Sequence, residues 1–448
     1  MGSARPRRIA AIKEPRLIIF LCFLLLCACG GGIARVDAFP LIYIRPAAVL
    51  TIGALFVAPG TWDCRGLRIP AAFLAAFTLT ILIQLVPLPP TIWAALPARA
   101  PYLAAADIAG IPQPWRPISL IPVRTLNSIF AMLPAFTTVV AMAGISRRNW
   151  WVIGDLCLVL CCVSSLLGIV QFATGTLYFS TPSDQGMPIG LFANRNHQAL
   201  FLVIGILLLA HWGMRERRIG DHLARQGIAL GGTLIFVIVI LLTGSRTGLM
   251  LLLGALAMTA ATMALRKQQT RLPTFLVILA PFAMVAIGAY FAQESSIVRL
   301  DQSVGKLDQD MRILALPTVW EIMVRYLPWG TGFGTFDRLF MQFEPDAMLT
   351  QRFFNRAHND PLEVLITGGI PSAMIILLFL LWLLVMGGSV LKKCGLSMDK
   401  IQTLAIVSTL FIMLGSIVDY PLRTPLIATI FCIMVCFATA YRGNAKNA

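Results

Sequence analysis

Three short polar motifs in the sequence each stand directly before a long apolar run. They read "NRNH" from Asn194, "SRTG" from Ser245 and "HNDP" from His358. The planar guanidinium group of arginine binds phosphate oxygens through two parallel hydrogen bonds, so Arg195 and Arg246 are candidates for a diphosphate clamp. Histidine titrates near neutral pH and can take a proton from a hydroxyl group. His358 is therefore the candidate general base.

The residues that follow Arg195 extend this candidate binding site. Asn196 and His197 are both polar, and His197 could equally be a further substrate contact or an interface residue. Simpler roles exist for the other groups too. A single arginine at the end of a membrane helix is commonly an interfacial anchor, and a loop histidine commonly forms local hydrogen bonds. Two arginines at successive helix ends favour a binding site over an anchor.

The sequence lacks the motifs of several enzyme classes. It contains no HExxH, no GxSxG and no P-loop, so protease, esterase and nucleotide-hydrolase functions find no support. No pair among the ten cysteines has convincing metal-ligand spacing. All ten fall in predicted spans or cytoplasmic segments, so no disulfide framework is implied on the outer side. We expect neither a metal site nor a cofactor.

Each motif also carries the signals that begin a helix. Asn194 or Asn196 suits one N-cap, and Ser245 suits another after Gly244 has ended the preceding helix. The third motif predicts a capping box with proline in the first helical position; its N-cap, first and third residues are Asp360, Pro361 and Glu363. The two arginines and the histidine then lie at helix N-termini, where backbone N–H groups and the helix dipole favour an anion.

The composition is that of a membrane protein. Of the 448 residues, 58% are hydrophobic and 12% are charged. Apolar stretches of about 20 residues recur, as an α-helix needs to cross a hydrocarbon core of roughly 30 Å. The short alternating segments of a β-barrel are missing. The sequence predicts an all-α, polytopic transmembrane helical bundle of about 12 spans, near residues 17–34, 41–58, 69–86, 125–145, 150–172, 197–213, 228–243, 247–265, 274–292, 362–388, 402–418 and 424–441.

Lysine and arginine predict the orientation of this bundle. With the N-terminus inside, 21 of the 36 basic residues fall in the short cytoplasmic segments, as the positive-inside rule requires. All three motifs then face the outer compartment. The net charge of +16 reflects this topology and contact with membrane lipids, and not nucleic-acid binding. The first span also resembles a secretory signal with a cleavage site at Cys29, but the eleven spans after it favour a retained helix.

Three loops on the outer side are long enough to carry function. Residues 87–124 are rich in proline and tryptophan and are expected to lie along the membrane interface. Residues 173–195 lead into the first motif. Residues 293–361 form the largest loop, which holds 9 of the 20 acidic residues. A loop of this length is usually functional or disordered, and its aromatic content predicts an ordered element close to the membrane.

Four segments, in this order and spacing, resemble the O-antigen ligase and polymerase family of bacterial envelopes. They are "GLFANRNHQA", "LTGSRTGLMLLL", "DMRILALPTVWEIMVRYLPWGTGFGTF" and "HNDPLEVLITGGIP", and "DYPLRTP" at 419–425 resembles the closing segment of that family. The resemblance covers residues 186–425, which predicts a catalytic region there. Residues 1–185 match only in hydropathy and in their Pro/Trp-rich loop, and residues 426–448 hold the last helix and a cytoplasmic tail.

The resemblance implies a membrane glycosyltransferase of the C-type architecture, in the bacterial inner membrane with its active site facing the periplasm. Such enzymes move a glycan from undecaprenyl diphosphate to a sugar hydroxyl, without a metal and with inversion. It implies that Arg195 and Arg246 bind the diphosphate, that Arg312 of the large loop joins them, and that His358 is the general base. An acceptor on the lipid A core would make the protein a ligase, and a second lipid-linked glycan would make it a polymerase. The sequence leaves both open.

A transporter, such as a flippase for the same lipid-linked glycan, is the alternative function. Transporters commonly have internally related halves or interrupted helices that meet at the middle of the bilayer. The sequence has no internal repeat, and its polar motifs gather at predicted helix ends. These features favour the enzyme.

Overall fold

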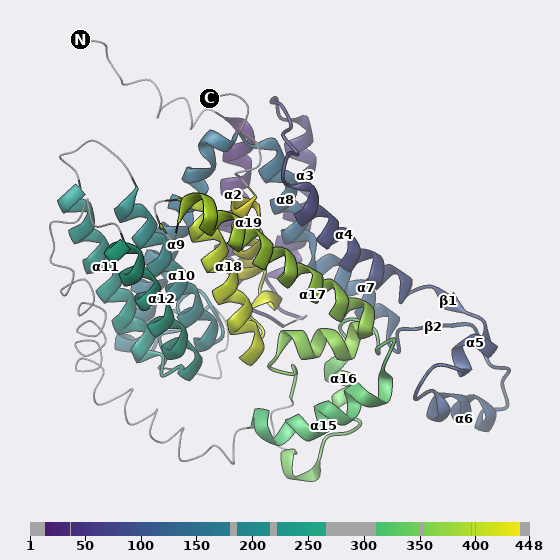
Figure 1. Cartoon of the computed structure of the whole chain (residues 1–448). Helices are drawn as coiled ribbons and strands as arrows, with labels where there is room; N and C mark the ends of the chain where they lie inside the picture. Colours follow the sequence, from purple (N-terminus) through teal and green to yellow (C-terminus); the bar gives the residue numbers. More distant parts are fainter. Residues whose placement is uncertain are drawn as a thin grey trace.

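The computed structural model describes residues 14–35, 37–179, 186–215, 222–265, 311–349, 354–395, 397–398 and 400–439. These residues are nearly all helical, which confirms the predicted all-α class (Figure 1). The only strands among them are β1 (Pro87–Leu88) and β2 (Arg116–Pro117), which pair antiparallel at the base of the first outer loop.

Eleven of the twelve predicted spans coincide with apolar helices. Within the described ranges, seven helical segments are long and apolar enough to cross a membrane. They are α7 (Pro122–Ala131) with α8 (Leu133–Gly144), α9 (Trp150–Thr174), α10 (Arg195–Met214), α11 (His222–Leu242), α12 (Arg246–Leu265), α17 (Asp360–Cys394) and α18 (Ile401–Val418). Four apolar helices are shorter than predicted: α2 (Pro15–Gly30), α3 (Leu41–Val57), α4 (Arg68–Ile83) and α19 (Pro425–Ala438). The predicted span 274–292 lies outside the described residues.

Helix α10 runs through the interior of the bundle. It packs against α9, α11, α12 and α18, and the helices α9 to α12 gather in one group (Figure 1). Every side chain from His197 to His211 is buried. A helix that is apolar on all sides is normally surrounded by protein or by lipid. Here neighbouring helices, and not lipid, cover the unbroken apolar run of α10.

Helix α19 connects this group to the N-terminal helices. It packs against α18 on one side and against α8 and α2 on the other. Helix α3 lies along α8, and α17 crosses both α4 and α18. One apolar core runs through both halves of the bundle and includes Phe20, Trp150 and Phe437, with the rings of the last two stacked 5.6 Å apart. Burial of such large rings is a major source of stability.

The two long loops that are predicted to lie on the outer side form structure of their own. The first carries α5 (Pro90–Ala94) and α6 (Ala100–Ile108), which extend away from the bundle (Figure 1). The described part of the largest loop forms α15 (Met311–Tyr326), α16 (Phe336–Phe340) and a 3-10 turn, η5 (Asp346–Met348). Its own apolar cluster includes Phe336, Phe340 and Phe354, whose rings lie within 6.3 Å of one another. This part of the loop is ordered by aromatic packing.

Helix α17 is interrupted at Gly369, where the backbone turns into the left-handed region with φ of 67°. The break exposes backbone groups that the segment "PWGTGF" of the large loop uses. Ile370 N–H donates to the Pro328 carbonyl at 2.8 Å, and Thr331 N–H donates to the Ile366 carbonyl at 3.1 Å. The large loop is thus attached directly to the first third of α17, the part that begins beside His358.

Gln84, at the end of α4, ties the first outer loop to this junction. Its Nε2 donates to the Thr367 carbonyl at 2.9 Å, and its Oε1 accepts the N–H of Phe333 at 3.1 Å. Its backbone carbonyl accepts the N–H of Ser119. A buried amide whose hydrogen bonds are all satisfied fixes the register of the elements around it. Gln84 therefore connects the first outer loop, the large loop and α17 to one another.

Candidate functional site

The first polar motif forms the N-terminus of α10. Asn194 has extended backbone angles, and its Oδ1 accepts the N–H of Asn196 at 2.8 Å, so it is the N-cap. Of the two predicted cap residues, Asn194 is thus the one used. Arg195, Asn196 and His197 occupy the first turn. Within the described part of the chain, the half-buried side chain of Arg195 makes no hydrogen bond or ion pair.

Side chains of α9 hold the turn before α10 in place through hydrogen bonds. Gln171 accepts the N–H of Gly190 at 2.7 Å through Oε1 and donates to the Gly190 carbonyl at 2.9 Å through Nε2. Ser164 accepts the N–H of Leu191 and donates to Gln198. Gln171 is therefore an internal hydrogen-bond partner, as its position in the fifth span suggests. These bonds fix the direction in which the first turn of α10 presents its side chains.

The site centres on Asp419, which the sequence analysis did not assign. This carboxylate follows α18 directly and is 2% exposed. Its Oδ2 accepts hydrogen bonds from the side-chain amides of Asn194 at 3.1 Å and Asn196 at 2.6 Å. Its Oδ1 accepts the N–H of Tyr420 at 3.0 Å. Its sequence signals were its place at the end of an apolar run and at the start of the segment "DYPLRTP", but neither gave it a role or a partner.

Two histidines and one arginine surround the same carboxylate. Asp419 Oδ1 lies 3.4 Å from Nδ1 of His358 and 3.9 Å from Nε2 of His197, and Asp419 Oδ2 lies 3.8 Å from Nη2 of Arg312. Burial raises the pKa of a carboxyl group, but the contact with His358 and the charges of His197 and Arg312 hold the pKa of Asp419 well below its usual range. Asp419 is therefore ionised at neutral pH.

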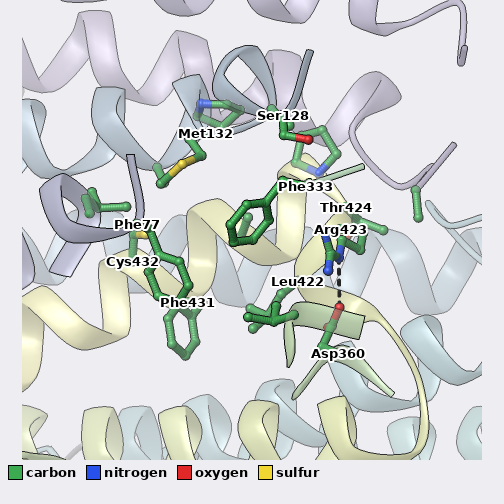
Figure 2. A pocket seen from close by; sticks show the side chains of 18 of the residues that line it. Phe77, Ser128, Met132, Phe333, Asp360, Leu422, Arg423, Thr424, Phe431 and Cys432 are labelled. Carbon is green, nitrogen blue, oxygen red and sulfur yellow. Dashed lines mark hydrogen bonds and ion pairs between the residues drawn. The ribbon is translucent and has the colours of Figure 1, made fainter. Parts of the chain in front are cut away.

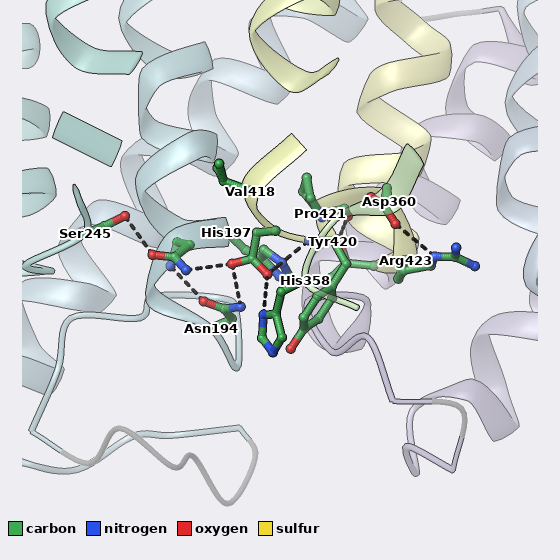
Figure 3. Close-up of polar contacts among 12 residues, drawn as sticks. Asn194, His197, Ser245, His358, Asp360, Val418, Tyr420, Pro421 and Arg423 are labelled. Carbon is green, nitrogen blue, oxygen red and sulfur yellow. Dashed lines mark hydrogen bonds and ion pairs between the residues drawn. The ribbon is translucent and has the colours of Figure 1, made fainter. Parts of the chain in front are cut away.

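His358 lies in the loop before α17 with its ring against two aromatic side chains. Its centroid is 4.9 Å from that of Tyr420 and 5.3 Å from that of Phe354. Its backbone has φ of 49°, a conformation that costs energy for any residue with a Cβ. Figure 3 shows His358 and Asn194 beside Tyr420, and both side chains face the carboxylate of Asp419. The fold thus holds this histidine in a defined orientation.

The predicted capping box of α17 is wrong in its residues. Asn359, and not Asp360, is the N-cap, since its Oδ1 accepts the N–H of Leu362 at 2.9 Å. Asp360 instead pairs with Arg423 at 2.9 Å, so a partner from the turn after α18 takes its carboxylate. Glu363 is buried and accepts from Arg356 at 2.9 Å, so it does not bond back to the N-cap. Asparagine is as good an N-cap as aspartate, so Asn359 caps the helix while Asp360 is paired with Arg423.

Arg356, Asp360, Glu363 and Arg423 form one ion cluster. In the sequence, Arg356 precedes His358 and the other three follow it. Besides the two close pairs, Nη2 of Arg423 lies 3.5 Å from Glu363, and Glu363 accepts the N–H of Ala357 at 3.1 Å. The negative charges of Asp360 and Glu363 raise the pKa of Arg423 against the opposing effect of its burial. The cluster joins the His358 loop to η6 (Pro421–Arg423) and so fixes Asp419 relative to His358.

The second motif meets the first through a direct hydrogen bond. Ser245 caps α12, because its Oγ accepts the N–H of Gly248 at 2.9 Å, and it donates to Oδ1 of Asn196 at 2.7 Å. Gly244 ends α11 in the left-handed region, with φ of 60°. Both features match the sequence prediction. Arg246 is the first residue of α12, so the first turns of α10 and α12 lie side by side.

Arg312 reaches the site from the large loop. Its Nη1 donates to the Val418 carbonyl at 3.1 Å, at the C-terminal end of α18. The structure therefore brings Asn196, His197, His358 and Arg312 together around Asp419. Arg195 and Arg246 lie on adjacent first turns at the same end of the bundle. The N-termini of α10, α12 and α17 and the C-terminus of α18 thus converge at one place.

Comparison with known protein families gives a match over about a third of the chain. Residues 231–378 fit the family model described as O-antigen ligase. This part of the chain is similar to the O-antigen ligase family. The match runs from α11 to the middle of α17, so it is shorter than the resemblance expected from the sequence at 186–425. It includes Arg246, Arg312 and His358. No curated protein matches the chain.

The side chains that meet around Asp419 resemble no metal centre. Across the described ranges, no group of three or more His, Cys, Asp or Glu residues is arranged to hold a metal ion. The site combines one carboxylate with imidazole, amide and guanidinium groups. The guanidinium groups and the amide nitrogens donate hydrogen bonds, and the amide oxygens of Asn194 and Asn196 accept them from protein groups. Such a set can bind an anion and move a proton.

Proposed function

We propose that this protein transfers a glycan from undecaprenyl diphosphate to a sugar hydroxyl, as an enzyme of the O-antigen ligase or polymerase type. The observation that carries the proposal is His358 beside the buried, ionised Asp419 at the meeting point of three helix N-termini. The match of residues 231–378 to the O-antigen ligase family model supports a membrane glycosyltransferase of the ligase or polymerase type in general. The chemistry that follows is what the geometry supports best.

The donor diphosphate is bound by Arg195, Arg246 and Arg312 in this proposal. Helices α10 and α12 both begin at the site, and their N–H groups and dipoles stabilise an anion there. Arg195 has no partner among the described residues, so its guanidinium fork can bind phosphate oxygens. Arginines placed where charge develops can stabilise the departing diphosphate without a cation.

His358 acts as the general base. With Asp419 facing Nδ1, the proton of a neutral imidazole is held on Nδ1 and the lone pair on Nε2 is free to accept a proton. Nε2 takes the proton of the acceptor hydroxyl while the hydroxyl oxygen bonds to the anomeric carbon of the donor. The bond from that carbon to the diphosphate breaks, and the diphosphate leaves with the electron pair. Attack opposite the leaving group inverts the anomeric centre.

We place the reaction at the periplasmic face of the bacterial inner membrane. The orientation rests on the basic residues of the predicted cytoplasmic segments, and the donor lipid requires a membrane. The acceptor is the lipid A core in a ligase and a second lipid-linked glycan in a polymerase. His358 and the arginines serve both reactions equally, so the chemistry of the site is common to them.

An in vitro assay tests the proposed function. Purified protein is incubated with an undecaprenyl-diphosphate glycan, with or without lipid A core, and the products are separated by size. Lipid A conjugates indicate a ligase, and longer lipid-linked chains without added acceptor indicate a polymerase. We expect one of these products, also in excess EDTA. The protein must also unfold cooperatively on heating, which shows that it was folded. If such protein forms neither product, the proposed function is wrong.

A further inference from the structure

A cavity lies beside the ion cluster, and residues of that cluster line it, whereas His358 does not. Its volume is about 330 Å³, and it is lined by residues of α3, α4, α7, α8, α17, α18 and α19. Its walls are mostly aliphatic and aromatic, and include Ile44, Phe73, Phe77, Phe379, Phe431 and Val435. Figure 2 shows Phe77 and Phe431 on one side, with Arg423 and Asp360 at the other. The cavity is long and apolar with one polar end.

Arg45 also lines the cavity, and it has no acidic partner among the described residues. It lies in the first turns of α3, and its only hydrogen bond among the described residues is from Nη1 to Oδ1 of Asn127 at 2.7 Å. Its Nε is buried without a hydrogen-bond partner in the same ranges. Arg356 and Arg423 also line the cavity, but the ion cluster balances their charges. An arginine at membrane depth is costly unless it is paired or binds a ligand.

The position of the cavity relative to the site is informative. Arg356 and Asp360 line the cavity, and His358 stands between them in the chain. The proposed diphosphate clamp lies on α10 and α12, which do not line the cavity. His358 and Asp419 therefore lie between two places where an anionic lipid can bind. A transferase with two lipid-linked substrates needs this arrangement.

We propose that the cavity holds the polyprenyl chain of a lipid-linked acceptor, with the phosphate of that lipid at Arg45. This inference rests on the proposed function. The volume of 330 Å³ is near the lower end of the roughly 300–1,000 Å³ common for ligand pockets. It is large enough for a segment of one hydrocarbon chain and too small for the several acyl chains of lipid A together. A single-chain acceptor makes the reaction a polymerisation.

Photo-crosslinking tests the binding site directly. The protein in nanodiscs is exposed to undecaprenyl phosphate that carries a diazirine in its chain, and the labelled peptides are identified by mass spectrometry. We expect labels on α4 and α19. Ala428→Phe fills the cavity and Arg45→Gln removes the charge, and each should reduce labelling at least about tenfold. Leu50→Phe, on the exposed side of α3 (72% exposed), is the matched control and should not.

Competition and kinetics separate this inference from the proposed function. Excess unlabelled undecaprenyl phosphate should compete with the probe and remove the labels. If excess phosphatidylglycerol or lipid A removes them equally well, the cavity is not a site for a single-chain acceptor. Ala428→Phe and Arg45→Gln should raise the KM for the acceptor and leave the KM for the donor unchanged. Labelling that survives in a catalytically silent protein contradicts the proposed function alone. Wild-type transfer by both variants contradicts the cavity site alone.

Discussion

Asp419 determines what His358 can do. It accepts hydrogen bonds from Asn194 and Asn196, so its position is fixed independently of the histidine. Its lowered pKa keeps it charged across the neutral range. A fixed anion at Nδ1 orients the imidazole ring and stabilises the imidazolium ion that forms when Nε2 takes a proton. The pair therefore has the two properties required of a general base: a set direction and a stabilised product.

Asp419→Asn tests this role because it keeps the size of the side chain and removes the charge. We expect the transfer rate to fall about 10²–10⁴-fold, the contribution of a general base, and His358→Ala should cause a similar fall. The double variant should be little worse than either single one, since the two residues act as a unit. Rates come from the glycan-transfer assay. Asp155→Asn, which breaks the distant pair with Arg215, is the control and should retain near wild-type activity.

The arginine clamp has its own test. Arg246→Lys keeps the charge but loses the planar fork, and Arg195→Ala loses both, so each should reduce transfer at least about tenfold. Arg65→Ala, at an exposed position in a predicted cytoplasmic segment, should have little effect. Activity is compared at matched expression. If all three variants are equally active, Arg195 and Arg246 are interfacial anchors.

At the scale of elements, the break in α17 connects the large loop to the site. Gly369 permits the break because a Cβ at this position would lie 2.2 Å from the Pro328 carbonyl oxygen. Its φ of 67° is also disfavoured for other residues. The segment that follows Pro328 pairs with the backbone freed by the break. One glycine thus couples the large loop, and Arg312 with it, to the helix that begins beside His358.

Gly369→Ala should destabilise the fold by about 1–3 kcal/mol or more, since it combines a strained backbone with a steric clash. We expect a lower unfolding temperature in detergent and a loss of transfer activity. Gly388→Ala is the matched control in the same helix, because a Cβ there meets nothing within 4 Å. It should stabilise α17 slightly. An unchanged unfolding temperature for Gly369→Ala would show that the break is not needed.

At the scale of the whole molecule, the site requires one end of the bundle to face the donor glycan. The convergence of α10, α12, α17 and α18 is a property of the fold, but the side of the membrane follows only from the basic residues. We predict that a cysteine at Gln342 reacts with a membrane-impermeant thiol reagent in intact cells. A cysteine at Arg65 should react only after lysis. Both positions are exposed, and native cysteines are removed first. The reverse pattern would place the site in the cytoplasm.

Local properties of the sequence determined the helices and two of their caps. Hydropathy depends on neighbouring residues alone, so the described spans coincide with helices. The caps Asn194 and Ser245 bond to N–H groups within three residues, which a short motif can specify. The third cap was different. Its prediction failed because Arg423, distant in the chain, pairs with Asp360 and leaves Asn359 to cap α17.

Only the tertiary structure decided which polar groups meet. Asp419 begins the segment "DYPLRTP", which the sequence singles out without a role for the acid, and its partners come from α10, the large loop and the segment before α17. No local pattern encodes such contacts, since each depends on how distant helices pack. The same holds for α10 itself, because an apolar surface looks alike in sequence whether protein or lipid covers it. Residue types and helix positions are properties of the sequence, whereas the charge beside His358 is a property of the fold.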